Sequence, residues 1–125
     1  MVEFNKSRLE EDAIMAQITY DYFEKVDIRV GKIIRVEDFP KARNPTYKLW
    51  IDFGALGVRK SSAQITKLYS KDGLMGRLII AVINFPPRQI ADFGSEVLVL
   101  GVVLDNEAVV LVQPDGDVPP GKRIL

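Results

Sequence analysis

Two proline-bounded stretches of the sequence carry side chains that could bind a ligand. EDFPKARNPTY (37–47) holds Phe39 and Arg43, and NFPPRQ (84–89) holds Phe85 and Arg88. An aromatic ring can stack on a base or pack against an apolar group, a guanidinium can bind phosphate or carboxylate, and proline lowers the entropy lost on binding. These stretches therefore predict binding chemistry, with Arg43 and Arg88 at the surface because arginine is rarely buried without a partner.

The alternative for the two rings is structural. Phe39 and Phe85 could instead close the ends of the core while the prolines only turn corners. For Phe85 we favour this second interpretation on the sequence alone.

A third polar stretch, RKSSAQITK (59–67), has the alternation of a strand. Lys60, Ser62 and Gln64 would then share one face and project donors from it. Alternatively, the hydroxyls of Ser61 and Ser62 satisfy backbone groups at the start of a following helix. Trp50, the only tryptophan, is either a stacking platform on the same face or is covered by an amino-terminal helix.

The composition excludes several common kinds of catalytic site. With no histidine and no cysteine there is no histidine-assisted nucleophile, no imidazole proton shuttle and no His or Cys ligand for zinc. The sequence also lacks GxxxxGK[ST] and GxGxxG phosphate-binding motifs. Carboxylates such as Asp27 and Asp52 could still hold magnesium or transfer protons, but we expect a protein that is not an enzyme and has no cofactor and no metal.

The size and charge pattern indicate one small domain with a basic middle. The chain has 125 residues, of which 47% are hydrophobic and 27% charged, and its net charge is zero. Residues 1–24 hold six acids and two bases, residues 25–89 thirteen bases and five acids, and residues 90–125 six acids and two bases. A fold that gathered the middle bases would attract polyanions, although chance division of solubilising charges gives the same counts.

We expect a cytoplasmic protein without membrane insertion. The sequence has no apolar run of membrane-spanning length, and its acidic beginning lacks the pattern of a secretory signal.

Periodicity predicts an all-β fold. A capping box at Ser7 starts a helix over 8–20, and strands follow over 28–36, 47–53 and 58–65. In the first strand Val30, Ile34 and Val36 would share one face opposite Ile33, with a bulge or bend at Gly31. In the second strand the aliphatic set faces away from Trp50.

The remaining elements complete a barrel. A helical turn within 66–73 ends at Gly73, and strands are expected over 77–85, 96–104 and 108–114. The connection between the first two of these strands is expected to be a binding loop that carries Phe85, Arg88 and Phe93. Three strands, a short helix and two more strands are the order of an OB-fold, a five-stranded Greek-key barrel, with a small SH3-like barrel as the rival. OB-folds bind through the face of strands 2 and 3 and the loops beside it, where the first and second quoted stretches would lie.

Four segments carry a family resemblance. FEKVDIRVGKI (23–33), FPKARNPTYKLWIDFG (39–54), KSSAQITKLY (60–69) and VINFPPRQIADFGSEVLVLG (82–101) resemble the tRNA-binding-domain family of OB-folds, and within it most closely the CsaA-type chaperones. The resemblance spans residues 22–125. It implies an OB-fold domain over 22–104 preceded by a helical extension over 1–21, and a homodimer joined in part by residues 105–125.

The resemblance also implies a function and a site. It points to a chaperone for unfolded or export-bound polypeptides, with structure-specific tRNA binding by the same surface as the alternative. Positions that match the family's binding surface are Lys60, Ser62, Gln64, Asn84, Arg88 and Ser95. The sequence departs from the tRNA binders at Phe39-Pro40 and Arg43, where they carry histidine-proline, and at Glu96, where they carry glutamine. Both departures match the CsaA pattern and weaken the tRNA interpretation.

Overall fold

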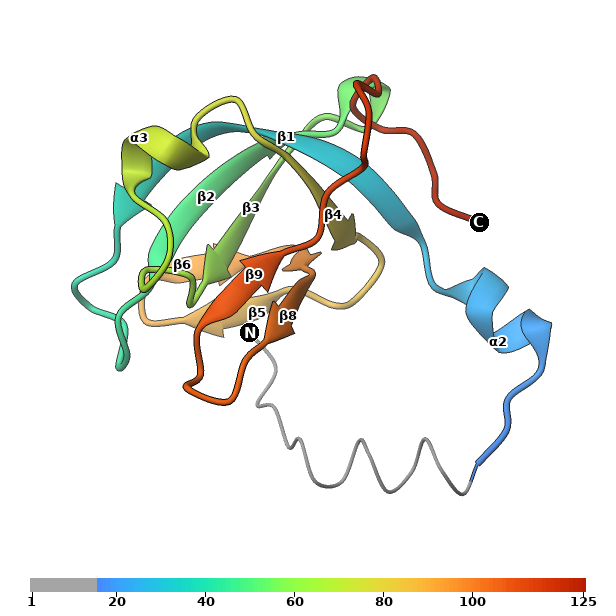
Figure 1. Ribbon diagram of the computed structural model, residues 1–125, viewed down its shortest axis with the longest axis horizontal. Coiled ribbons are helices and arrows are strands. Elements are labelled where there is room, and N and C mark those ends of the chain that lie inside the picture. The colour runs from blue at the N-terminus through green and yellow to red at the C-terminus, as the bar shows by residue number, and fades with distance from the viewer. Residues whose placement is uncertain (1–15) are drawn as a thin grey trace.

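The computed structural model describes residues 16–125, which form a nearly closed five-stranded antiparallel barrel (Figure 1). Its strands lie in the order β3-β2-β1-β4-β7. They are β1 (Ile28–Asp38), β2 (Tyr47–Asp52), β3 (Val58–Ala63), β4 (Leu78–Val82) and β7 (Leu98–Val99). A short helix, α3 (Lys71–Leu74), lies between β3 and β4. The predicted OB-fold is confirmed.

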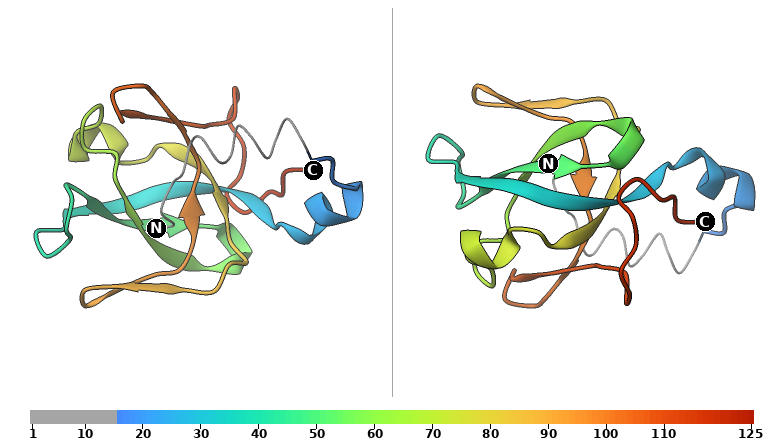
Figure 2. Two further views of the ribbon diagram at one scale, coloured as in Figure 1. Left: turned by 90° about the horizontal axis from the view of Figure 1, so that it is seen from below. Right: turned by 90° about the horizontal axis from the view of Figure 1, so that it is seen from above.

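Two hairpins and two further helical segments extend from the barrel. β5 (Arg88–Ile90) pairs with β6 (Phe93–Ser95), and β8 (Gly101–Val103) pairs with β9 (Val109–Leu111). α2 (Tyr20–Lys25) precedes β1, and the 3-10 turn η1 (Gly54–Leu56) joins β2 to β3. Figure 2 shows the two hairpins on opposite sides of the barrel. In residues 16–125 no helix has the length and apolarity needed to span a bilayer.

The core follows from the alternation of β2. Leu49, Ile51 and Phe53 are completely buried, while Trp50 lies on the other face and is half-buried. Ile33 of β1 and Ile79 of β4 fill the same core. The face assignment made for residues 47–53 is therefore confirmed.

In β1 the predicted faces of Ile33 and Ile34 are wrong, whereas Val36 packs against the core as predicted. The register with β2 slips between Ile33 and Arg35, which leaves Ile34 as an extra residue. Ile33 is buried and Ile34 is 42% exposed, the reverse of the prediction. A β-bulge at Ile34 accounts for this difference, since its extra residue allows Ile33 and Val36, three positions apart, both to face the core.

Further expectations need correction in the second half of the chain. The run 96–104 is not one strand but is divided between β7 and β8, which belong to different sheets. At the division, a Cβ on Gly101 would lie 2.3 Å from Cγ1 of Val109, so the hairpin returns against bare backbone. The connection between residues 85 and 96 is not only a loop, because it contains the β5–β6 hairpin.

The helical predictions are only partly met. Ser70 caps α3 by accepting a hydrogen bond from the Gly73 amide at 3.0 Å, so Gly73 lies inside the helix rather than ending it. Of the helix expected over 8–20, residues 8–15 lie outside the described residues. Residues 16–19 are not helical, and α2 begins only at Tyr20.

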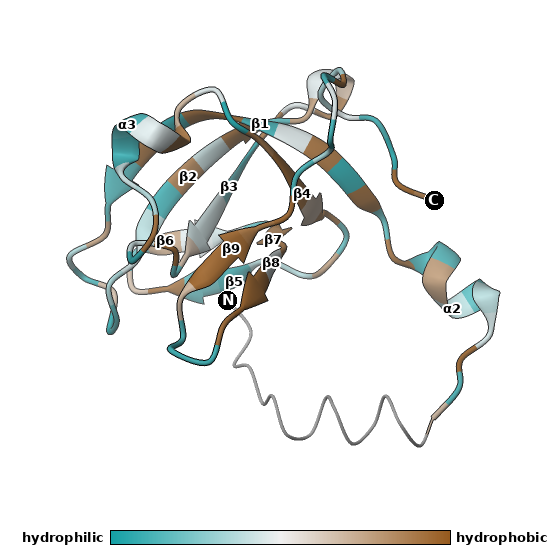
Figure 3. Ribbon diagram, in the orientation of Figure 1, coloured by the Kyte–Doolittle hydropathy of each residue, from teal (hydrophilic) through white to brown (hydrophobic). Residues whose placement is uncertain are grey.

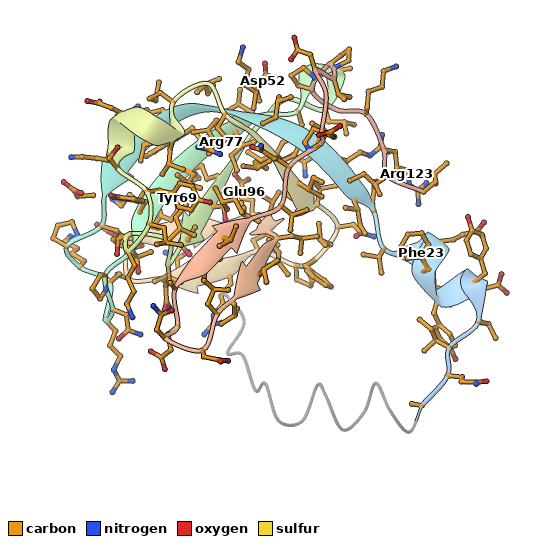
Figure 4. The ribbon with its side chains drawn as sticks, in the orientation of Figure 1. Phe23, Asp52, Tyr69, Arg77, Glu96 and Arg123 are labelled. Carbon is orange, nitrogen blue, oxygen red and sulfur yellow. The ribbon has the colours of Figure 1, made fainter. Side chains whose placement is uncertain are left out.

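The carboxy-terminal tail completes the edge of β1. The Gly121 amide donates to the Val30 carbonyl at 2.7 Å, and the Ile124 amide to the Ile28 carbonyl at 2.8 Å. Arg123 reaches from this tail to the Glu24 carbonyl at 2.7 Å and so connects it to α2 (Figure 4). The tail thus contacts the barrel of its own chain, and the domain boundaries given above stay predictions.

Candidate binding site

Three aromatic rings from distant parts of the sequence meet on the outer face of β2. Phe39 comes from the β1–β2 loop, Trp50 from β2 and Phe93 from β6. The centroid of Phe93 lies 5.5 Å from that of Phe39 and 5.8 Å from that of Trp50, both with edge-on geometry. This geometry is favourable for aromatic pairs. We call these three rings the aromatic cluster.

Three cations cover the aromatic cluster. Nζ of Lys48 lies 4.8 Å from the Phe39 centroid and 5.4 Å from the Phe93 centroid. Nζ of Lys60 lies 5.1 Å from the Phe93 centroid, and the Arg35 guanidinium lies 4.5 Å from the centre of the Trp50 ring. Such cation–π contacts are each worth about 0.5–1 kcal/mol at exposed sites. Arg35, Lys48 and Lys60 form what we call the cationic layer.

Strand register places the cationic layer. Arg35 lies opposite Trp50, and Trp50 lies opposite Lys60, so the three residues form one row across β1, β2 and β3. Lys48 lies opposite Ser62 in the next row. Because alternate residues of a strand face the same side, the row carries its charges on the face that points away from the core.

The β5–β6 hairpin is fastened to β3 through side chains. The Ser62 amide donates to Oγ of Ser95 at 3.1 Å, and Ser95 lies opposite Arg88 in the hairpin. Both serines are buried. Ser61 donates its hydroxyl to the Val97 carbonyl at 3.0 Å. The hydroxyl of Ser61 therefore satisfies a backbone group, as one alternative held, but at the closing seam of the barrel and not at a helix start.

Glu96 closes the same seam (Figure 4). Its amide donates to the Lys60 carbonyl at 2.8 Å, and its carboxylate accepts the Lys60 amide at 2.9 Å. Both backbone groups of Lys60 are thus held by one residue. The negative charge of Glu96 consequently lies beside β3 at the border of the cationic layer.

An ion pair joins the two loops that flank the site. Nζ of Lys41 lies 2.8 Å from a carboxylate oxygen of Asp92, which connects the β1–β2 loop to the β5–β6 hairpin. This hydrogen bond lowers the pKa of Asp92 and raises the pKa of Lys41. Both groups are exposed, so the pair adds little to stability. Arg35 pairs in the same way with Glu37 on its own strand.

The structure brings several of the predicted site residues together. Phe39, Lys60, Ser62, Ser95 and Arg88 all belong to the site or to the strands that border it. Phe39 is only 4% exposed and so is not a free stacking face, but it lies in the aromatic cluster on the outer face of β2 and not in the barrel core, so neither alternative describes it. Phe85 is 46% exposed, so the favoured interpretation of Phe85 as a plug is wrong.

Other predicted residues are less closely tied to the cluster. Gln64 follows the end of β3 and is exposed, and Arg43 is exposed in the β1–β2 loop. Asn84 has a structural position: its Oδ1 accepts the Asp27 amide at 2.9 Å, and its Nδ2 donates to the Lys25 carbonyl at 2.7 Å. Its amide therefore ties β4 to the segment between α2 and β1, and its binding role stays a prediction.

Sequence reasoning missed four contributors to the site. Lys48, Arg35 and Phe93 were not among the predicted site residues, and Trp50 was left undecided. The alternation of β2 was a sufficient signal for Lys48, which points to the same side as Trp50. Phe93 was placed in the second loop by its aromatic character, but its contacts could not be predicted, because they depend on a hairpin that folds back over β2. In residues 16–125 no group of three metal-ligating side chains comes together.

The barrel and its charged face together define a class of protein. An OB barrel with a charged face on β2 and β3, flanked by the β1–β2 loop and the β5–β6 hairpin, is a binding domain of the type that holds an extended ligand. The family model described as "Putative tRNA binding domain" matches residues 28–123, and the chain belongs to this family.

The comparisons also show particular relatives. The crystal structure of the chaperone CsaA from Bacillus anthracis superposes with a TM-score of 0.85 at 47% identity, covering 88% of this chain and 100% of that chain. CsaA from Picrophilus torridus superposes with a TM-score of 0.82 at 55% identity, covering 87% of this chain and 100% of that chain. The similarity to CsaA chaperones expected from the sequence is confirmed.

Longer relatives contain this domain as one part. The methionine–tRNA ligase of Thermococcus onnurineus is 34% identical over 119 residues, which are 95% of this chain but 16% of that protein. The ligase of Pyrococcus abyssi is 36% identical over 107 residues, 86% of this chain and 14% of that protein. This chain therefore spans about a sixth of these ligases and matches them only as a domain.

Proposed function

We propose that the protein is a non-enzymatic chaperone that binds unfolded or export-bound polypeptides in the cytoplasm. The observation that carries the proposal is the match to two CsaA chaperones at 47% and 55% identity over their whole chains. The site suits this role, because the cationic layer can hold carboxylates while lysine stems pack against apolar side chains. Binding by these groups needs no nucleotide.

Suppression of aggregation tests the proposal. We expect the protein at equimolar ratio to lower the light scattering of a thermally unfolding client. The Lys48→Gln and Lys60→Gln variants should suppress less, because each removes a charge of the cationic layer. Lys122→Gln is the matched control, since this exposed lysine lies in the carboxy-terminal tail. Scattering that is unchanged by the parent protein would contradict a chaperone role.

Binding of tRNA by the same face is the second candidate. The family and the cationic layer favour it, whereas Glu96 and Glu37 at the border of the site oppose it. Phosphate contacts make affinity fall with salt, with a log–log slope of about −0.9 per contact on duplex. Titration with tRNA at two ionic strengths distinguishes the candidates, and loss of binding in Lys60→Ala and Arg88→Ala would support this one. No detectable binding at low salt would remove it.

We also propose that the protein is a homodimer joined through the β8–β9 hairpin and the segment after it. Val102 and Val110 lie opposite each other on this hairpin and are 54% and 39% exposed, with Leu104 exposed beside them. Figure 3 shows both strands as apolar. An exposed apolar patch of this kind is typical of an interface. The aromatic cluster, beside the opposite hairpin, would stay accessible.

A charge placed in this patch should dissociate the dimer. We expect Val110→Asp to sediment as a monomer, because a paired interface would bury an unpartnered carboxylate. Phe85→Asp, which changes an exposed ring beside the hairpin on the opposite side of the barrel, should keep the parent mass. A parent protein that sediments as a monomer, or a Val110→Asp variant that stays dimeric, would show that this hairpin does not join subunits.

A further inference from the structure

The ring faces of the aromatic cluster are already occupied within the chain. Phe39 and Phe93 are 4% and 5% exposed, and the Arg35 guanidinium lies 4.5 Å from the centre of the Trp50 ring. Stacking of a nucleobase requires an exposed ring face. The outermost groups of the site are therefore cations, and the rings lie beneath them and hold them in position.

Two lysines of the cationic layer share one ring. Because Nζ of Lys48 lies 5.4 Å and Nζ of Lys60 lies 5.1 Å from the Phe93 centroid, the two ammonium groups are no more than about 10.5 Å apart. Within residues 16–125 neither ammonium group forms an ion pair, whereas the neighbouring Arg35 and Lys41 each have a carboxylate partner. Within the cationic layer, these two lysines are consequently the charges that a ligand can neutralise.

The spacing of the lysines fits an extended chain. Lys48 lies opposite Ser62, two residues along β3 from Lys60, so the lysines are diagonal neighbours on one face. Such neighbours have Cβ atoms about 7–8 Å apart, or somewhat less. In an extended peptide, side chains at positions i and i+2 lie on one side and are about 6.6–6.8 Å apart. Two acidic residues separated by one residue would therefore reach both ammonium groups.

We propose that the site selects extended acidic polypeptide segments in which carboxylates alternate, one bound by Lys48 and the other by Lys60. This inference rests on the proposed chaperone function and names the class of segment that is held. Phe93 fixes both ammonium groups in advance, which lowers the entropy lost when the carboxylates bind. Charge-assisted hydrogen bonds of this kind are roughly twice as strong as neutral ones.

A polypeptide fits this site better than a nucleic acid does. Glu37, Asp92 and Glu96 border the cationic layer. A strand with a phosphate at every nucleotide would bring some of its charges close to these carboxylates and would find no open ring face in the aromatic cluster. A peptide that carries only two carboxylates, both within reach of the lysines, keeps its charges away from these acidic side chains and needs no stacking.

Labelled peptides test the proposal by fluorescence anisotropy. The probe is a short peptide of β-forming residues with one Glu-x-Glu pattern, and the comparison peptides carry Gln-x-Gln, adjacent Glu-Glu or Lys-x-Lys. We expect the Glu-x-Glu peptide to bind most tightly, about tenfold or more above Gln-x-Gln, since tenfold corresponds to one such interaction. Adjacent glutamates should bind less well, because one of them points away from the site.

Variants assign the effect to the two lysines. Lys48→Gln and Lys60→Gln should each remove most of the preference for Glu-x-Glu. Lys48→Arg, which keeps the charge, should keep the preference, and Lys122→Gln should leave it unchanged. Equal binding of Glu-x-Glu and Gln-x-Gln peptides would overturn the proposal. The proposal would also fail if tRNA displaced the bound peptides and the protein did not prefer one peptide over another. If aggregation is suppressed while the peptides do not discriminate, the chaperone function survives and this inference fails.

Discussion

Phe93→Ala is expected to abolish ligand binding and to lower the free energy of unfolding by about 3 kcal/mol or more, the usual range for a buried phenylalanine. The Phe93 ring contacts Phe39 and Trp50 and lies beneath Lys48 and Lys60. Without it the β5–β6 hairpin loses its apolar contact with β2, and both ammonium groups lose the ring that holds them. Binding and stability should therefore fall together.

Phe85→Ala is the matched control. Phe85 stands just before the same hairpin and is 46% exposed, so its truncation should change stability by less than about 1 kcal/mol. Urea unfolding followed by Trp50 fluorescence measures the first effect, and anisotropy with the Glu-x-Glu peptide measures the second. Trp50 is a suitable reporter because its ring contacts Phe93 directly. Equal losses in the two variants would show that Phe93 does not organise the site.

Local pattern predicts the fold well where the chain alternates regularly. In β2 each inward residue, such as Leu49, is followed by an outward one, such as Trp50, and the structure keeps this order. In β1 the same reasoning fails at Ile34, because the extra residue of a bulge is set by pairing with β2 rather than by the sequence of β1. The division of residues 96–104 escapes prediction for a similar reason, since the change of sheet at Gly101 depends on contact with Val109.

The site was predictable in composition but not in arrangement. Prolines, cations and aromatics identified the two flanking segments, and the alternation of β3 placed Lys60 on the correct face. What the pattern could not give is which ring lies under which cation. Those contacts arise when Phe93, 43 positions after Trp50 in the sequence, is brought onto β2 by the hairpin.

Gly31→Ala is expected to destabilise the barrel by about 1–3 kcal/mol, the usual cost of overpacking a core, or by more. A Cβ at this position would lie 2.5 Å from Cγ2 of Ile51 and 2.7 Å from Cε1 of Phe53. Both contacted side chains are completely buried and cannot turn into solvent. Gly31 therefore leaves room for the Ile51 and Phe53 side chains against β1, rather than marking the bulge, which lies three residues further along.

Gly116→Ala provides the comparison, because a Cβ there meets nothing within 4 Å and its backbone does not have a positive φ. The control should leave stability unchanged or raise it by about 0.4–1 kcal/mol, since alanine restricts the unfolded chain. Both variants can be compared by urea unfolding. Displacement of Ile51 would also move its neighbour Trp50, so Gly31→Ala should shift the tryptophan emission of the folded protein and weaken peptide binding. A Gly31→Ala variant as stable as Gly116→Ala would mean that Ile51 and Phe53 can move aside at no cost, and that their packing against Gly31 does not hold the binding face in place.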